Sequence, residues 1–212
     1  MIAFENVSKS FWTGKSRKVI LDRASFRVEL GNSLGILARN GSGKTTIINM
    51  MAGLEKPDEG RITRAARISF PLGFMGGVIN KHTATENARY IARLYGLDAD
   101  YIESFCRWLT DIGEYFDMPV GTYSSGMRAR LGFAVALAME ADLLLIDEVL
   151  SVGDQDFQEK SEKAVMHAVN QGCAMVLVSH SPIKLKKWTD SVLTFEKGII
   201  CPPAPEKVGT SA

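Results

Sequence analysis

A glycine-rich segment between an apolar run and a helix-like run constrains this chain more than any other feature. The apolar run is 34–37, the helix-like run is 46–51, and between them stands Ala38-Arg39-Asn40-Gly41-Ser42-Gly43-Lys44-Thr45. A strand, a tight glycine turn and a helix in that order are the context of a phosphate-binding P-loop. The alternative is an ordinary strand–turn–helix with a chance Gly-Lys-Thr.

The chemistry of a P-loop predicts the role of each part of this segment. Backbone N–H groups of the turn would cradle nucleotide phosphates, with help from the dipole at the helix N-terminus. Lys44 would reach the β- and γ-phosphates, and the Thr45 hydroxyl would bind Mg²⁺. We therefore expect the chain to bind a nucleoside triphosphate. The predicted nucleotide contacts are Ala38, Asn40, Gly41, Ser42, Gly43, Lys44, Thr45 and Thr46.

The first position of the pattern departs from it, because Ala38 stands where glycine is usual. If that position required a positive φ, alanine would cost about 1–2 kcal/mol. If it required only a small side chain, the cost would be near zero. We favour the second interpretation because Gly41 and Gly43 are in place.

Composition limits the possible classes of protein. The chain has 212 residues, 46% of them apolar, which is enough for one compact domain or a domain with a small lobe. The formal net charge of +1 gives no electrostatic pull toward nucleic acid, so no nucleic-acid partner is expected. Three widely spaced cysteines favour neither a zinc site nor disulfides, which suggests a reducing cytosol.

Neither a signal peptide nor a membrane span is expected. The N-terminus lacks a basic segment followed by an apolar one, and no uncharged apolar run approaches the roughly 20 residues of a spanning helix. A role at a membrane would therefore require a partner.

Hydrophobic periodicity predicts an α/β core with a parallel sheet, preceded by antiparallel strands and interrupted by an inserted helical block. The expected antiparallel strands are 2–7 and 18–30, with a turn over 11–16 and a further strand pair or hairpin over 61–70. The expected helices are 84–116 with a break near 96–98, 125–141, 156–170 and 182–188. The expected later strands are 142–147, 173–179 and a hairpin over 191–200 that turns at 197–198, before a loose tail over 201–212.

A second chemical motif ends the apolar strand at 143–146, where Asp147 and Glu148 follow. In a P-loop protein, ligands bind at the C-terminal ends of parallel strands. An aspartate there can hold Mg²⁺, and an adjacent glutamate can polarise the attacking water. The alternative is a buried strand followed by a solvated acidic turn.

Two further segments could contact phosphate. Tyr123-Ser124-Ser125-Gly126-Met127 opens a predicted helix, and its serine is either an ordinary N-cap or part of a second phosphate site. His180 ends the predicted strand 176–179, and although a lone histidine is often structural, its place at a strand end favours a functional role.

Taken together, these motifs resemble the nucleotide-binding subunit of ABC transporters over almost the whole chain. Residues 41–45 match the Walker A loop, 143–148 the Walker B strand, 151–154 the D-loop, and His180 the switch histidine. Residues 123–127 resemble a variant signature motif, with Ser125 and Met127 where glycine and glutamine are usual. The implied fold is a P-loop NTPase core with an antiparallel β subdomain and an inserted α-helical subdomain over about 84–140, within a domain over 1–200.

The resemblance implies that two copies bind ATP between them, head to tail, and that closing and reopening of this dimer accompany hydrolysis. Ser124 and Gly126, with Ser125 beside them, would contact the γ-phosphate bound by the other copy, and Asp154 of the D-loop would lie at the nucleotide. Glu148 would be the general base, with Lys44 and His180 completing the catalytic set, and Thr45 and Asp147 would hold Mg²⁺. Phe11, in preference to Trp12, would stack on adenine, unless it is simply a core or lid aromatic.

One departure from the family suggests a cargo. The glutamine expected before the helical lobe is replaced by Pro71-Leu72-Gly73-Phe74-Met75-Gly76-Gly77, which puts its contacts with Mg²⁺ and the membrane partner in doubt. This segment, with 123–131 and 146–154, resembles the polysaccharide-exporting branch, and the absence of an extra C-terminal domain resembles its capsular members. That resemblance implies a subunit at the cytoplasmic face of the bacterial inner membrane, docked to an integral-membrane permease through the helical lobe.

Other functions stay open. The cargo could be O-antigen, teichoic acid, another lipid-linked molecule or a drug, because the motifs report on ATP and not on cargo. A soluble ABC ATPase acting on ribosomes or DNA is a more distant alternative, since such proteins usually carry two nucleotide-binding domains or a long coiled coil.

Overall fold

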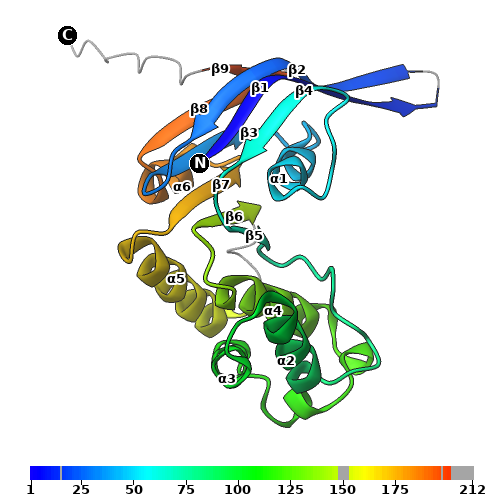
Figure 1. Cartoon of the computed structure of the whole chain (residues 1–212), viewed down its shortest axis with the longest axis vertical. Coiled ribbons are helices and arrows are strands. Elements are labelled where there is room, and N and C mark those ends of the chain that lie inside the picture. The colour runs from blue at the N-terminus through cyan, green and yellow to red at the C-terminus, as the bar shows by residue number, and fades with distance from the viewer. Residues whose placement is uncertain (15, 148–152, 197, 202–212) are drawn as a thin grey trace. The chain divides into compact units, whose positions relative to one another are not determined.

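The computed structural model describes residues 1–14, 16–147, 153–196 and 198–201. The chain divides into two compact units. The first unit contains Met1–Ala65 together with Val176 and the residues after it, and the second contains Ala66–Met175. Figure 1 gives the element labels used below.

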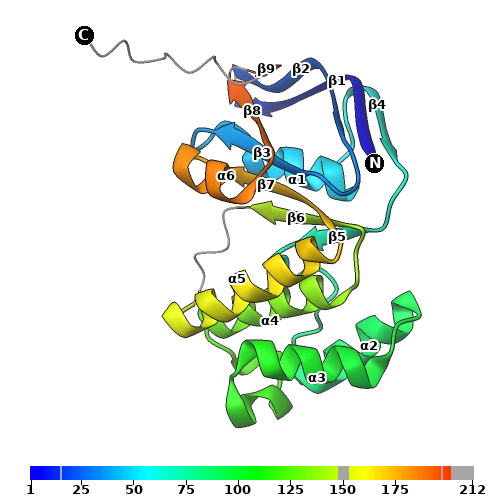
Figure 2. The ribbon, with the colours of Figure 1, turned by 90° about the vertical axis from the view of Figure 1, so that its left-hand side faces the viewer.

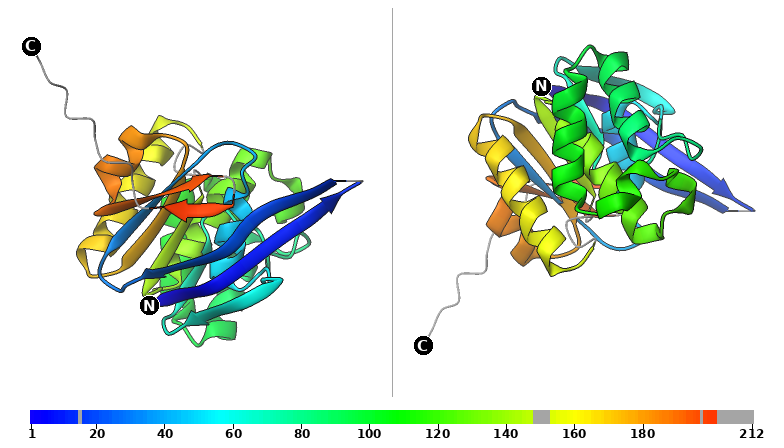
Figure 3. Two further views of the ribbon diagram at one scale, coloured as in Figure 1. Left: turned by 90° about the horizontal axis from the view of Figure 1, so that it is seen from above. Right: turned by 90° about the horizontal axis from the view of Figure 1, so that it is seen from below.

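A long antiparallel hairpin begins the first unit. Its sheet has the order β2-β1-β4, from the strands β1 (Ile2–Thr13), β2 (Ser16–Val28) and β4 (Glu59–Arg64). β4 pairs only with the first part of β1, as far as Ser8, so the far end of the hairpin extends beyond it (Figure 3). The antiparallel strands were predicted correctly, but the turn over 11–16 was placed too early, because β1 continues to Thr13.

The remaining strands of the first unit lie in the order β7-β3-β8-β9. They are β3 (Ser33–Ala38), β7 (Ala174–Ser179), β8 (Ser191–Glu196) and β9 (Ile199–Cys201), accompanied by the helices α1 (Lys44–Ala52) and α6 (Pro182–Trp188). β3 pairs with β8 in parallel, and β8 pairs with β9 antiparallel, which confirms a parallel core and a closing hairpin. Cys201 was predicted to begin the tail. It is instead the last residue of β9, where it pairs with Thr194 of β8.

The segment 61–70 was predicted as one strand pair or hairpin, and this prediction was wrong. Its first part is β4, which pairs antiparallel with β1. Its second part is β5 (Ile68–Pro71), which pairs in parallel with β6 (Leu143–Asp147) in the second unit. Two neighbouring strands with alternating residues can join different sheets, and periodicity alone does not distinguish this from a hairpin.

The second unit is mainly helical (Figure 2). Its helices are α2 (Ala84–Tyr95), α3 (Ala99–Thr110), α4 (Ser125–Ala138) and α5 (Gln155–Asn170), with short 3₁₀ turns η1 (Gly113–Asp117) and η2 (Val120–Thr122). These bounds confirm that the predicted helices exist and that a break separates α2 from α3. The helix predicted to reach residue 116 was too long, because Asp111 ends α3 with a positive φ of 47° and η1 follows. The helix predicted over 125–141 ends at Ala138. Thr83 and Glu86 form a reciprocal capping box that starts α2.

Packing around α4 organises this unit. Every residue of α4 from Leu131 to Ala138 is buried, which marks it as a core helix and not a surface one. Nearby, Arg107 of α3 donates two hydrogen bonds to Asp117 at the end of η1, at 2.9 and 2.8 Å, and Thr85 of α2 adds a third at 2.7 Å. These bonds, led by those from Arg107, lower the pKa of Asp117 to about 2.

In the described part of the chain, no helix combines the length and apolar character that crossing a membrane requires.

Candidate functional site

The predicted P-loop joins β3 to α1 within the first unit. Gly41 has φ 75° and Gly43 has φ 112°, both in the left-handed region that favours glycine. A Cβ added to Gly43 would also lie only 2.6 Å from Cγ2 of Ile20. The loop is closed by the amide of Ser42, which donates to the carbonyl of Arg39 at 3.2 Å. Both glycines are therefore required by the backbone of this turn.

Ala38 ends β3 in an extended conformation, paired with Phe195 of β8. Among the residues that the structure describes, the non-glycine residues with positive φ are Asn6, Arg23, Asp111 and Glu140, and Ala38 is not one of them. Its exposed fraction is 2%. The position therefore demands a small side chain in a packed strand and not a left-handed backbone, which removes the cost considered for alanine there.

The N-terminus of α1 has the features of an anion site. Among the described residues, no side chain caps this end of the helix, and the Ile47 amide donates to the carbonyl of Gly43 at 3.1 Å. Lys44 Nζ donates to Asn40 Oδ1 at 2.9 Å, which holds a cation beside the turn. The Ser42 hydroxyl oxygen is buried and has no hydrogen-bond partner among the described residues. The positive end of the helix dipole and a nearby ammonium together suit a phosphate group.

The β1–β2 hairpin brings an aromatic side chain toward this loop. Phe11 pairs with Lys18 across the two strands, so their side chains share one face of the sheet. Lys18 Nζ donates to the carbonyl of Gly41 at 2.6 Å, which places that face on the P-loop side. Trp12 pairs with Arg17 and points to the other face, with 74% of its surface exposed. Register therefore favours Phe11 over Trp12 as the ring nearest the nucleotide loop.

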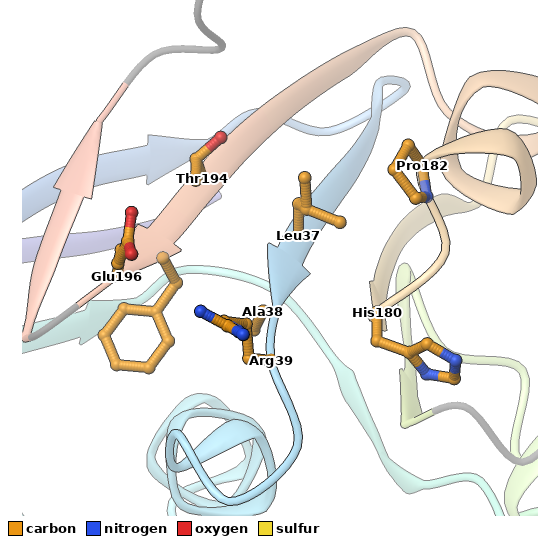
Figure 4. Close-up of a pocket in the computed structure, with 8 residues that line it drawn as sticks. Leu37, Ala38, Arg39, His180, Pro182, Thr194 and Glu196 are labelled. Atoms are coloured by element: carbon orange, nitrogen blue, oxygen red, sulfur yellow. The ribbon is translucent and has the colours of Figure 1, made fainter.

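A pocket of 270 Å³ in the same unit adjoins the end of β3. Figure 4 shows side chains entering it from the ends of β3 and β8 and from the segment after β7. Its lining residues are Leu37, Ala38, Arg39, His180, Pro182, Thr194, Phe195 and Glu196. His180 is exposed directly after the fully buried strand β7, so the imidazole emerges at that strand's C-terminal end, as predicted from the sequence.

In the second unit, Ser124 is the N-cap of α4, and its hydroxyl accepts a hydrogen bond from the amide of Met127 at 3.2 Å. The ordinary N-cap interpretation of this serine is therefore correct as far as it goes. Ser125 and Gly126 follow in the exposed first turn. A pocket of 230 Å³ opens at this helix end, lined by Ile112, Tyr115, Ser124, Gly126, Met127, Arg130 and Gly153.

Asp154 is the N-cap of α5, and its carboxylate is already engaged within the second unit. One oxygen accepts the amide of Phe157 at 3.0 Å, and the other accepts Arg130 Nη2 of α4 at 2.6 Å. These two bonds, the Phe157 amide first, lower the pKa of Asp154. Arg130 also lies over the Phe157 ring, with its guanidinium carbon 5.1 Å from the centroid. This link between Asp154 and Arg130 of α4 was not predicted from the sequence.

The acidic strand end is described only in part. Asp147 is the last residue of β6 and is half-buried. Glu148, with Ser151 and Val152 of the predicted D-loop, lies outside the described residues. No cluster of three or more His, Cys, Asp or Glu side chains suited to a metal occurs among the residues that the structure covers.

The segment that replaces the family's glutamine packs tightly against α4. The Leu72 amide donates to the carbonyl of Leu145 at 2.9 Å, which extends the pairing of β5 with β6. Gly132 of α4 faces the next residues so closely that an added Cβ would lie 2.9 Å from Met75 Sδ. The same Cβ would lie 3.1 Å from the carbonyl oxygens of both Gly73 and Phe74. Gly132 was not singled out in the sequence, although a glycine inside a predicted helix is a signal of close approach.

Known proteins resemble the chain in sequence and in fold. The family described as ABC transporter matches residues 21–151. The ATP-binding protein BexA of Haemophilus influenzae is 42% identical over 94% of this chain and 92% of its own length. The capsule polysaccharide export ATP-binding protein CtrD of Neisseria meningitidis is 42% identical over 93% of this chain and 91% of its own. A dimeric post-hydrolysis structure of the ATP-binding cassette MJ0796, bound to ADP and Pi, shares the fold, with TM-score 0.79 at 21% identity over 94% and 96% of the two chains.

Proposed function

The chain belongs to the ABC transporter family of ATP-binding proteins, and on that premise we propose that it hydrolyses ATP to drive export of a capsular polysaccharide across the bacterial inner membrane. The observation that carries the ATPase part is the P-loop, in which two glycines with positive φ lead into the N-terminus of α1 and the Lys44 ammonium lies beside the turn at Asn40. The cargo rests on the relatives, since CtrD is by name a capsule polysaccharide export protein.

Each candidate side chain has a role in this proposal. Lys44 neutralises the β- and γ-phosphate oxygens, and the turn amides over Asn40–Thr46 orient the triphosphate. Thr45 and Asp147 would hold Mg²⁺, which supplies charge neutralisation between the phosphates when bound. Glu148 is the general base that takes a proton from the attacking water, and His180 holds the γ-phosphate and that water in line. Phe11 stacks on adenine.

A second copy of the chain completes the site in this proposal. Ser124, Ser125 and Gly126 at the open end of α4 would contact the γ-phosphate bound by the other copy, and Asp154 would lie beside it. ATP would stabilise the closed dimer because it bridges surfaces that are otherwise unpartnered, and loss of phosphate would let the dimer reopen. The shared fold with a cassette solved as a dimer is consistent with this assembly.

The permease would dock on the second unit, near the segment that replaces the family's glutamine. An apolar pocket of 300 Å³ is present there. It is lined by Phe70, Gly76, Gly77, Val78, Ile79, Tyr90, Ile91, Leu94 and Tyr95. Tyr90 and Leu94, four residues apart on α2 and therefore on one face, are 45% and 64% exposed. We propose that a short helix of the permease occupies this pocket, which would keep the chain peripheral at the cytoplasmic face.

The test is a chromosomal Glu148→Gln substitution in the bacterium that encodes the chain, with polysaccharide stained inside and outside the cell. The matched control is Glu29→Gln, which removes an exposed carboxylate after β2. Polymer trapped in the cytoplasm beneath a bare surface, with a normal control, is the expected result. A normal surface layer of polysaccharide, together with lost ATPase activity of the purified variant, would overturn the assignment of capsular polysaccharide as the cargo. O-antigen, teichoic acid or another lipid-linked molecule would then be the alternative.

A further inference from the structure

Lys9 of β1 is a nearly buried cation in the first unit, and the P-loop chemistry does not use it. Only 9% of its side chain is exposed. Its ammonium lies 2.6 Å from Glu55 Oε1 and 3.2 Å from Asp58 Oδ1, and it donates to the carbonyl of Lys56 at 2.8 Å. Lysine is almost never buried without such partners, so these three oxygens account for its position.

The same acidic segment holds the next residue of β1. The Ser10 amide donates to Asp58 Oδ2 at 2.8 Å, and the Ser10 hydroxyl lies 3.1 Å from that oxygen. Hydrogen bonding to Glu55 raises the pKa of Lys9. Burial opposes ionisation of Asp58, but hydrogen bonds from Ser10 and Lys9 outweigh it and lower that pKa. Lys9 and Asp58 are therefore charged at neutral pH, and β1 is fixed to 55–58 immediately before Phe11.

The clamped segment continues directly from the P-loop helix. The amides of Leu54 and Glu55 both donate to the carbonyl of Asn49 near the end of α1, at 2.8 and 3.2 Å. The clamp formed by Lys9, Glu55 and Asp58 thus connects β1 to the helix whose other end begins at the phosphate loop. The position of Phe11 relative to that helix depends on these contacts.

Lys9 also contacts the aromatic ring itself. Its Nζ lies 5.0 Å from the centroid of Phe11, within the range of a cation–π interaction. Phe11 is 39% exposed, so packing alone leaves its ring free to take other rotamers. A fixed ammonium over the ring favours one of them.

We propose that Lys9 is a positioning residue for the nucleotide base: clamped by Glu55 and Asp58, it holds the Phe11 ring in the orientation that receives adenine. The inference rests on the proposed function, in which Phe11 stacks on adenine. Lys9 acts through Phe11 and does not touch the triphosphate.

The test is a double-substitution cycle on the purified full chain, with dissociation constants measured for MgATP and for inorganic tripolyphosphate. Lys9→Met is expected to weaken MgATP binding about tenfold. Lys9→Arg keeps the positive charge and is expected to weaken it about threefold or less. In a Phe11→Ala background, Lys9→Met is expected to change MgATP affinity less than twofold. Tripolyphosphate affinity is expected to stay within twofold throughout, since it has no base to stack.

Two further variants keep the test decisive. Lys56→Met removes a neighbouring exposed lysine side chain but keeps the carbonyl that Lys9 uses, and is expected to bind like the unaltered chain. If the Lys9→Met variant does not fold, Glu55→Gln weakens the clamp by changing the partner of Lys9. It is expected to raise the dissociation constant for MgATP about threefold, and only when Phe11 is present.

The outcomes separate this inference from the proposed function. An equal loss from Lys9→Met with and without Phe11, or a parallel loss of tripolyphosphate binding, would mean that Lys9 supports the loop generally and would overturn the inference alone. If Phe11→Ala leaves MgATP affinity unchanged, Phe11 does not stack on adenine, and this inference is overturned together with the role proposed for Phe11, while ATP hydrolysis and export are tested separately by Glu148→Gln.

Discussion

Replacing Gly132, in the interior of α4, by alanine is expected to destabilise the protein, although the same replacement usually stabilises a helix. Alanine in a helix interior is normally favoured over glycine by about 1 kcal/mol. At Gly132, however, the new Cβ would lie 3.1 Å from two backbone carbonyl oxygens and 2.9 Å from Met75 Sδ. The sulfur is the end of a flexible side chain and can move. The carbonyls of Gly73 and Phe74 are backbone atoms that follow Leu72, whose amide is hydrogen-bonded to Leu145 of β6, so they can move less.

Overpacking of this kind costs about 1–3 kcal/mol. Subtracting the propensity gain leaves an expected net destabilisation by Gly132→Ala of about 1 kcal/mol. For a chain of this length, that lowers the unfolding midpoint by about 2–4 °C. The assay is thermal unfolding followed by circular dichroism, with the free energy checked by urea titration.

The matched control lies in the first turn of the same helix. A Cβ on Gly126 would meet only Ser124 Oγ, at an ordinary 3.8 Å. Gly126→Ala is therefore expected to raise stability by a few tenths of a kcal/mol. Unfolding midpoints that rise together in both variants would refute the argument, because the close approach of 73–75 to α4 would then impose no cost.

The other predictions concern the P-loop, its first position and an acid-sensitive contact. Lys44→Ala is expected to lower ATP hydrolysis at least about a hundredfold, as loss of a transition-state charge does, without a change in circular dichroism, and measurable phosphate release at the normal rate would contradict this. Ala38→Gly is expected to lower stability by about 0.5–1 kcal/mol, because Ala38 is a buried strand residue, and to leave ATP affinity within about twofold. Asp117 has a folded pKa of about 2 and an ordinary unfolded pKa of about 3.9, so its contribution is present above pH 4 and lost as pH falls toward 2. The difference in unfolding midpoint between the unaltered chain and Asp117→Asn should therefore shrink over that interval, and a constant difference would exclude this linkage.

Much of the fold could be predicted because its signals are local. A window of about a dozen residues is enough to recognise the P-loop glycines, the helices of the second unit and the buried strands. The errors came where partners lie far apart in sequence. β5 was grouped with β4 because its partner, Leu143 in β6, lies far along the chain. The hairpin turn was misplaced because Phe11 and Trp12 look like turn aromatics but alternate across two faces of a strand.

The candidate site shows the same division. The residue types expected to bind phosphate follow from the motif, and the positive φ of Gly41 and Gly43 is that of a tight glycine turn. The supporting contacts could not be anticipated, because each joins residues distant in sequence: Lys18 with Gly41, Arg130 with Asp154, and Lys9 with Glu55. Long polar side chains on a strand or helix have many possible partners, and only tertiary structure selects among them.

The two ends of α1 are treated in opposite ways. At its C-terminus, Gly53 closes the helix by donating to Asn49 and Met50, and Arg64 of β4 donates to the carbonyls of Met50 and Met51. At its N-terminus, the described residues provide no side-chain cap. The helix is thus anchored by protein contacts at the end away from the phosphate loop, so we expect its folding not to depend on an anion. The free energy of unfolding should then rise with nucleotide concentration [L] as RT ln(1 + [L]/Kd), without a further cost for ordering the helix.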